Sequence, residues 1–254
     1  MGNPSIDALA MLHLTVLALW GGVVATEAVI EVAATMATAC RAGIVLVENS
    51  DELFPVAETL SSLPPVKNNR VAVLADGGGH ATIAADLLSE GGVEIPPLNE
   101  KTQVKLREFL PAAASVRTPV DVAGGADADP EIFAHCARVL LHDPQIGGLL
   151  IVGLFGGYSI RFAESLAFVE EDAAHQMGKL VAECKKPIVV HSLYNHARPH
   201  SLDLLRYYNI PVYDSLEIAS RTGPWRFRIS MPMASTAWRT PYRQLSGGCS
   251  NVCR

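Results

Sequence analysis

Residues 71–88 read VAVLADGGGHATIAADLL. The first five of them are a continuous apolar run, which is typical of a parallel strand buried on both faces. Asp76 and three glycines then break the run, and residues 80–90 have the apolar spacing of a helix. Glycines at such a turn allow close backbone approach, and the helix start offers unpaired N–H groups to a phosphate or a carboxylate. A tight turn without a ligand is the alternative.

Strand and helix patterns alternate along the chain after this unit. Short apolar runs predict strands at residues 93–95, 119–122, 148–154, 187–190 and 211–213. Helical spacing predicts helices at residues 100–109, 130–141, 162–184, 202–208 and 215–220, and Asp129 is expected to cap the second of these. This alternation predicts a three-layer αβα fold of the α/β class, with a parallel sheet covered by helices on both faces.

The segments on either side of this unit differ from it. Residues 9–25 form an uncharged apolar run near the lower length limit for a membrane span. No Lys or Arg precedes the run, so a signal peptide is not indicated, and we expect a buried helix or strand pair rather than a membrane span. Helical spacing returns at residues 51–60, and Pro64 and Pro65 mark a boundary. Residues 223–254 show neither helical nor strand periodicity, which predicts an irregular or disordered tail.

Composition and charge restrict the class of protein. The chain has 254 residues, of which 49% are hydrophobic and 18% are charged, as in globular proteins. Its net charge is -6 and it has no basic run, which argues against nucleic-acid binding. Five cysteines, an odd number, indicate reduced thiols and a cytoplasmic protein. Because the cysteine and histidine spacings match no metal-ligand pattern, no metal site is predicted.

A second glycine-rich turn follows the central apolar run. Residues 153–159 read GLFGGYS, and both turns follow strands, so they are expected at the same carboxyl edge of the sheet, where open α/β sheets bind ligands. Two purely structural turns are the alternative. Asp121 either accepts hydrogen bonds from these loops or caps a turn. His80, in the first turn of its helix, is placed to donate to a bound phosphate, to be phosphorylated, or to lie exposed.

Several common motifs are absent from these turns. The first turn is neither GxGxxG nor GxxxxGK[ST], so neither a dinucleotide-binding fold nor a P-loop follows. No GxSxG nucleophile elbow occurs either.

Three motifs together resemble the CoA-ligase domain of the succinyl-CoA synthetase β subunit and of ADP-forming acetyl-CoA synthetases. They are the first glycine turn with its helix, TPVDVAGGADADPEIF at 118–133, and LLIVGLFGGYS at 149–159, in the family's order. The resemblance covers residues 70–222 and implies a flavodoxin-like fold. Asp76 and Thr118 stand where the family usually has Asn. Because a carboxylate beside an anion is repulsive unless it is protonated or paired, the first departure is expected to weaken the transfer.

The segment before this domain carries a second, weaker resemblance. Residues 41–60 are similar to the end of the flavodoxin-like domain that precedes this one in single-chain family members, so residues 1–65 are expected to be a remnant or the C-terminal part of such a domain. The family's Ser-His-Thr-Gly loop, which carries the phosphorylated histidine, would fall near Val24, but residues 21–26 contain no His. ATP-grasp and CoA-binding Rossmann domains are not recognised either. The resemblance therefore implies that another chain supplies them and that this chain alone does not complete the reaction.

The resemblance also implies a reaction and a site. The family converts an acid, CoA and a nucleoside triphosphate to acyl-CoA, nucleoside diphosphate and phosphate, and two helix N-termini stabilise its phosphohistidine. The helix at His80 would be one of them. His80 would be catalytic and Asp121 supporting, and acyl-CoA, CoA or phosphate would meet Asp76, Gly77, Gly78, Gly79, His80, Ala81, Gly156, Gly157, Tyr158 and Ser159. CoA, ATP or ADP, and Mg²⁺ are implied for the full oligomeric assembly and not for this domain. A catalytically inactive CoA- or phosphate-binding or assembly module is the alternative.

Overall fold

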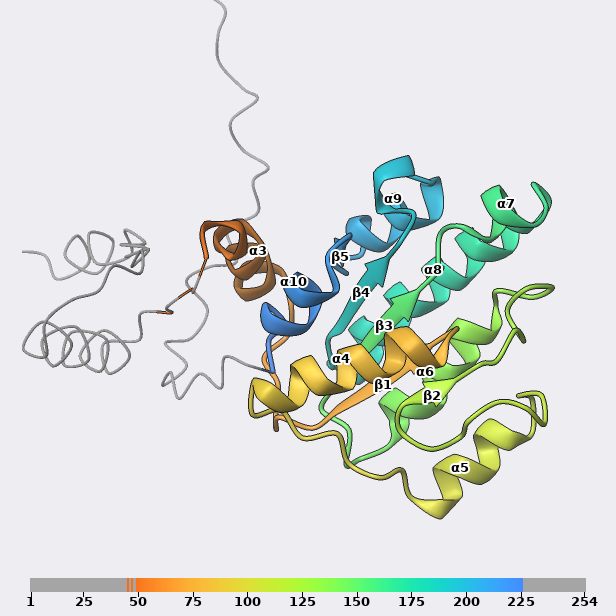
Figure 1. Cartoon of the computed structure of the whole chain (residues 1–254), viewed down its shortest axis with the longest axis horizontal. Coiled ribbons are helices and arrows are strands. Elements are labelled where there is room, and N and C mark those ends of the chain that lie inside the picture. The colour runs from red at the N-terminus through yellow and green to blue at the C-terminus, as the bar shows by residue number, and fades with distance from the viewer. Residues whose placement is uncertain (1–44, 46, 48, 226–254) are drawn as a thin grey trace, which may run out of the picture.

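A parallel sheet forms the centre of the computed structural model, which describes residues 45, 47 and 49–225 (Figure 1). Its strands, in the order β2-β1-β3-β4-β5, all pair in parallel. This order is one of the two common doubly wound arrangements, and it places a switch point between β1 and β3. The predicted α/β fold is confirmed. The strand bounds are β1 Val71–Ala75, β2 Val120–Asp121, β3 Gly148–Gly153, β4 Ile188–Ser192 and β5 Val212–Tyr213.

Apolar cores on both faces of the sheet explain the continuous apolar run of β1. All five residues of β1 are buried, and they alternate between two clusters of buried side chains. Ala72 and Leu74 belong to the larger cluster, whereas Val71, Val73 and Ala75 belong to the smaller one. A strand with packing on each side has no solvent-facing position, so it carries no polar alternation.

The helices form the two outer layers (Figure 1). The helices α4 and α10 cover one face of the sheet, and α6, α8 and α9 cover the other. The helix α5 packs against α6, and α3 lies beside α10, where Tyr213 donates a hydrogen bond of 3.0 Å to Glu58. The bounds are α3 Leu53–Ser62, α4 Gly78–Glu90, α5 Glu100–Arg107, α6 Ile132–His142, α7 Tyr158–Arg161, α8 Leu166–Cys184, α9 His200–Tyr207 and α10 Leu216–Arg221, with short 3-10 turns at η1 Ser50–Glu52 and η2 Asn195–Ala197.

Several predicted features differ in the structure. Residues 93–95 form only a single bridge, between Arg70 and Glu94, and not a strand. The predicted helix 162–184 is wrong in its first turn, because α7 ends at Arg161 and α8 begins at Leu166. The cap predicted at Asp129 is also wrong, since α6 begins at Ile132 with Glu131 before it; Asp129 instead accepts a hydrogen bond of 3.1 Å from the Glu131 N–H. The strand β4 extends two residues beyond the predicted end.

Several predictions fall outside the described residues. The apolar run at 9–25, most of the predicted preceding domain and the tail at 226–254 are among them. None of the helices that the structure describes is long and apolar enough to cross a membrane. The tail was predicted to begin at Gly223, but Trp225 is 1% exposed and packs in the smaller core, where its indole N–H donates to the Ser220 carbonyl.

Candidate functional site

Asp76 joins the two glycine-rich loops at the carboxyl edge of the sheet. The loops follow β1 and β3, which are neighbours in the sheet. Asp76 Oδ2 accepts a hydrogen bond of 2.7 Å from the Leu154 N–H and another of 2.7 Å from the Tyr158 hydroxyl. Gly153 has a φ of +128°, and a Cβ on it would overlap Asp76 Oδ1. The predicted convergence of Asp76 and Tyr158 is therefore a direct contact, and it depends on a glycine at 153.

Burial is the largest influence on the Asp76 carboxyl and raises its pKa above the ordinary value. The hydrogen bonds from Tyr158 and Leu154, and the charge of His80, act in the opposite direction. The Leu154 N–H and the Tyr158 hydroxyl of the neighbouring loop hold the side chain in place.

Replacing Asp76 by Asn is expected to change the pH dependence of stability. A folded-state pKa above the unfolded value gives a contribution that is complete at low pH and is lost as pH rises through the folded pKa. Asn cannot ionise, and its oxygen can accept from both donors, so the variant should gain stability relative to the native chain as pH rises above 3.8 and level off above the folded pKa. Urea midpoints of both proteins across a pH series measure this. An advantage that shrinks with rising pH would contradict it.

The start of α4 is open. Gly77 is the N-cap and no side chain caps it; the first helical hydrogen bond runs from the Ala81 N–H to the Gly77 carbonyl. Gly78 and Gly79 are exposed and His80 is half-buried. The N–H groups of these three residues have no acceptor within residues 49–225. Unpaired N–H groups at the positive end of a helix dipole are suited to an anion.

Asp121 lies beside the start of α4, but its side chain is hydrogen-bonded within its own loop. Its Oδ1 accepts a hydrogen bond of 2.9 Å from the Ala123 N–H, as in a capped turn. Its Oδ2 would lie 3.5 Å from a Cβ on Gly78. The turn-capping alternative left open by the sequence is thus the one observed.

In the second glycine-rich loop, backbone N–H groups at the start of α7 are already hydrogen-bonded to a buried carboxylate of the same chain. Glu170, on α8, is completely buried, and its Oε1 accepts from the N–H groups of Gly156 at 2.7 Å and Tyr158 at 3.1 Å. Its Oε2 accepts from the Ser159 N–H at 3.2 Å. Burial raises the pKa of Glu170, and these three donors act against that rise. The second loop therefore does not present these N–H groups to a ligand as the first loop does.

Close packing explains the glycines of the second loop. A Cβ on Gly156 would overlap Leu202 of α9, and one on Gly157 would overlap the ring of Tyr194. The glycines thus admit neighbouring side chains, and Tyr158 is completely buried.

A second histidine lies beside His80. His191, near the end of β4, is 2% exposed, and the centroids of the two rings are 5.9 Å apart. Burial lowers the pKa of His191, and the nearby His80 lowers it further. Its Nδ1 is buried without a hydrogen-bond partner in the part of the chain that the structure describes. The sequence placed His191 after the strand, so this pairing was not predicted.

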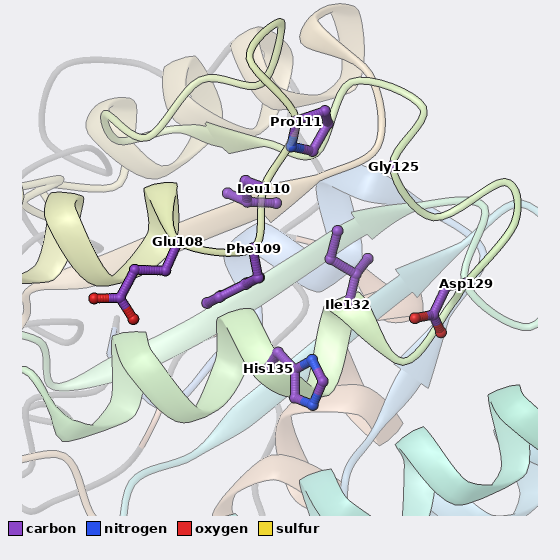
Figure 2. A pocket seen from close by; sticks show the side chains of 8 residues that line it. All are labelled: Glu108, Phe109, Leu110, Pro111, Gly125, Asp129, Ile132 and His135. Atoms are coloured by element: carbon purple, nitrogen blue, oxygen red, sulfur yellow. The ribbon is translucent and has the colours of Figure 1, made fainter.

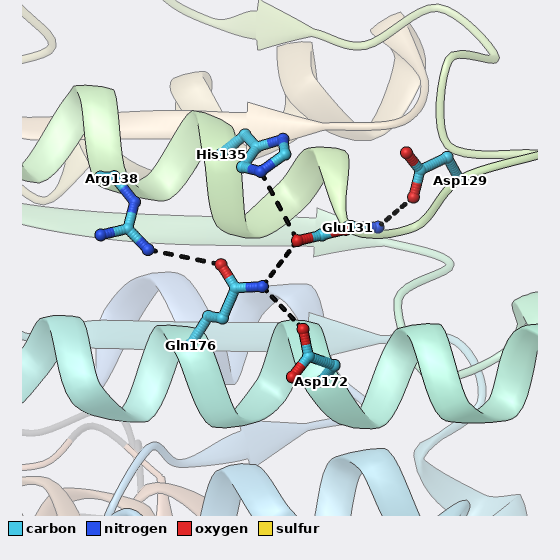
Figure 3. Close-up of polar contacts among 6 residues, drawn as sticks. All are labelled: Asp129, Glu131, His135, Arg138, Asp172 and Gln176. Carbon is cyan, nitrogen blue, oxygen red and sulfur yellow. Dashed lines mark hydrogen bonds and ion pairs between the residues drawn. The ribbon is translucent and has the colours of Figure 1, made fainter.

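A pocket and a hydrogen-bonded cluster lie away from the residues predicted for the site. A pocket of about 520 Å³ opens between the end of α5 and the start of α6 (Figure 2), lined by Glu108, Phe109, Leu110, Pro111, Gly125, Asp129, Ile132 and His135. Next to it, Gln176 of α8 donates to Glu131 at 2.7 Å and to Asp172 at 2.8 Å, and accepts from Arg138 at 3.3 Å (Figure 3). These contacts tie α8 to α6. No residue predicted for the site takes part in either feature.

Fold and site together define a doubly wound α/β domain in which the start of α4 is open at the carboxyl edge of the sheet. The chain belongs to the ligase-CoA domain family, whose model matches residues 71–215. The predicted family is confirmed.

The relatives include ADP-forming CoA ligases. The chain is 28% identical over 181 residues to the α subunit of ADP-forming acetate–CoA ligase II from Pyrococcus furiosus, covering 70% of this chain and 37% of the relative. It is 33% identical over 112 residues to ADP-forming acetate–CoA ligase I from Archaeoglobus fulgidus, covering 44% of this chain and 16% of the relative.

Two solved structures share the fold of this chain. A Pyrococcus horikoshii OT3 protein has a TM-score of 0.66 at 26% identity, covering 77% of this chain and 43% of that chain. A Korarchaeum cryptofilum dinucleotide-forming acetyl-coenzyme A synthetase, solved with phosphate and ADP, has a TM-score of 0.63 at 20% identity, covering 82% of this chain and 42% of that chain, and shows the fold alone. The chain spans less than half the length of each of these four relatives.

Proposed function

We propose that this chain is part of an NDP-forming acyl-CoA synthetase, in which the start of α4 stabilises the phosphoryl group of a phosphohistidine. The reaction joins an acid to CoA as a nucleoside triphosphate becomes nucleoside diphosphate and phosphate. The open N–H groups of Gly78, Gly79 and His80 are the observation that carries the proposal. Fixed N–H donors of this kind stabilise a dianion without having to reorganise during the transfer.

The closed second loop supports the choice of α4. Glu170 already accepts from the N–H groups of Gly156, Tyr158 and Ser159, so these three are not available to an incoming phosphoryl group, whereas those of α4 are. His80 is the third residue of α4, and because helical side chains lean toward the N-terminus, we expect its ring to reach a group bound at the N–H donors of α4. In this proposal its ring donates a hydrogen bond to a phosphoryl oxygen and is the catalytic side chain of this domain.

Partner domains supply the remaining parts of the reaction in this proposal. Among the described residues, no group of three or more His, Cys, Asp or Glu side chains is arranged to hold a metal ion. The proposal assigns Mg²⁺, the nucleotide and CoA to ATP-grasp and CoA-binding domains on another chain, within an oligomer, as the family resemblance implies. Cys136 and Cys184 are free, which is consistent with a reducing compartment, and we place the assembly in the cytoplasm.

A catalytically inactive phosphate-binding or assembly module is the second candidate. The lack of a histidine in residues 21–26 favours it, since the family's phosphate carrier would fall there. Mixing this chain with the partner domains separates the two functions. An active synthetase forms acyl-CoA only in the mixture, whereas an inactive module binds phosphate and leaves the partner's rate unchanged.

Replacing Gly79 by Asp tests the role of α4. A Cβ on Gly79 meets nothing within 4 Å, so the side chain fits, and a carboxylate at the start of a helix should stabilise the fold by about 0.5–1 kcal/mol. The same carboxylate repels an anion, so affinity for inorganic phosphate should fall about tenfold or more, equivalent to about 1.4 kcal/mol. Calorimetric titration with phosphate at constant ionic strength measures the affinity.

Gly79→Asn is the matched control, because it has nearly the same shape without the charge. It should bind phosphate about as well as the native chain. The proposal fails if the native chain does not bind phosphate, or if Gly79→Asp binds it equally well.

A further inference from the structure

His191 is a polar side chain in a position that normally holds an apolar one. Residues alternate between the faces of β4, and His191 shares a face with Val189, which packs in the smaller core under α4 and α10. A buried imidazole nitrogen without a hydrogen bond is costly, so such groups are rare unless they serve a purpose. The Nδ1 of His191 is one of these within the described chain.

The ring of His80, at the open start of α4, lies next to the ring of His191. The two rings are 5.9 Å apart between centroids and tilted by 36°. His80 is half-buried and belongs to the first turn of α4, whose N–H groups are open. The pair thus runs from the interior of the sheet to the opening at α4.

The surroundings of His191 favour its neutral form. Burial and His80 disfavour the charged form of His191, while the acidic Glu217 and Asp214 act in the opposite direction. Asp76 is the carboxyl that interacts with His80. A neutral imidazole has one nitrogen that accepts, and a ring protonated on both nitrogens donates two hydrogen bonds.

We propose that His191 is a positioning residue that holds the ring of His80 against the phosphoryl group bound at the start of α4. This rests on the function proposed above. In the bound state, one N–H of His80 donates to Nδ1 of His191 and the other donates to a phosphoryl oxygen. The arrangement gives the unpartnered nitrogen its hydrogen bond, and it fixes a ring that would otherwise be free to turn into solvent.

Phosphate binding and the ring resonances of His80 test this proposal. In the native chain, inorganic phosphate should shift the ¹⁵N and ¹H resonances of the His80 ring, which the variant His80→Asn identifies by their loss. In His191→Phe, phosphate affinity should fall about tenfold and the shift of the His80 ring should disappear. In His191→Asn, whose amide places a polar atom near the former Nδ1, much of both effects should return. His196→Asn, at an exposed histidine, is the control and should behave as the native chain.

The outcomes separate this proposal from the function on which it rests. If the native chain does not bind phosphate, the proposed function fails. If the native chain binds phosphate and His191→Phe does so equally well with the same His80 shift, only the role of His191 is overturned. Circular dichroism checks the fold of each variant. Should His191→Phe not fold, His191→Leu replaces it, and retained affinity with an unchanged His80 shift in that variant overturns the proposal in the same way.

Discussion

Replacing Glu170 by Ala is expected to lower the free energy of unfolding by about 3–5 kcal/mol. The change leaves the N–H groups of Gly156, Tyr158 and Ser159 without their acceptor in the interior, and it opens a cavity where a completely buried side chain stood. Urea unfolding followed by circular dichroism measures the loss.

Two further variants define what Glu170 contributes. Gln keeps the volume and one acceptor oxygen, so Glu170→Gln should cost less, about 1–3 kcal/mol. Glu164 is exposed, and Glu164→Ala should stay within about 0.5 kcal/mol of the native chain. A cost below about 1 kcal/mol for Glu170→Ala would show that the second loop does not depend on this carboxylate.

Gly153→Ala is expected to destabilise the domain by about 3 kcal/mol or more. The φ of +128° at this position is unfavourable for any residue with a Cβ, and the added methyl would overlap Asp76 Oδ1. Thermal and urea unfolding of the variant measure the loss.

A second substitution separates the two causes. In an Asp76→Ala background the overlap is relieved but the backbone strain persists, so Gly153→Ala should cost less there than in the native chain. Gly79→Ala is the control, because a Cβ at Gly79 meets nothing within 4 Å; it should be neutral or stabilise by up to about 1 kcal/mol. Equal costs for Gly153→Ala in both backgrounds would contradict the overlap with Asp76.

The local sequence pattern was sufficient to predict most of the strands of the sheet. The apolar run of β1 and the glycine turn after it predicted the strand and the open helix start, because both faces of the strand are covered and the turn lies beside it in sequence. The helix α7 was missed because the residues at its start are held by Glu170, which lies 11 to 14 residues downstream of its partners.

The remaining parts of the site depend on contacts that sequence spacing does not reveal. Glu170 does, however, share its helical face with Ala173, Ala174 and Met177, all buried, and a carboxylate in such a stripe is a usable signal. His191 ended the predicted strand because a histidine usually marks solvent. Here the strand continues through it, and only the tertiary structure brings it to His80.

The internal carboxylate of Glu170 also bears on how a partner domain docks. If a phosphorylated loop approaches this edge, it meets one electropositive opening at α4 and, in the neighbouring loop, peptide dipoles whose positive ends are already neutralised. In the function proposed above, the free N–H groups then favour the binding of the dianion at α4 rather than at the second loop. Under that proposal, the partner domain docks with its phosphorylated side chain pointing at the start of α4.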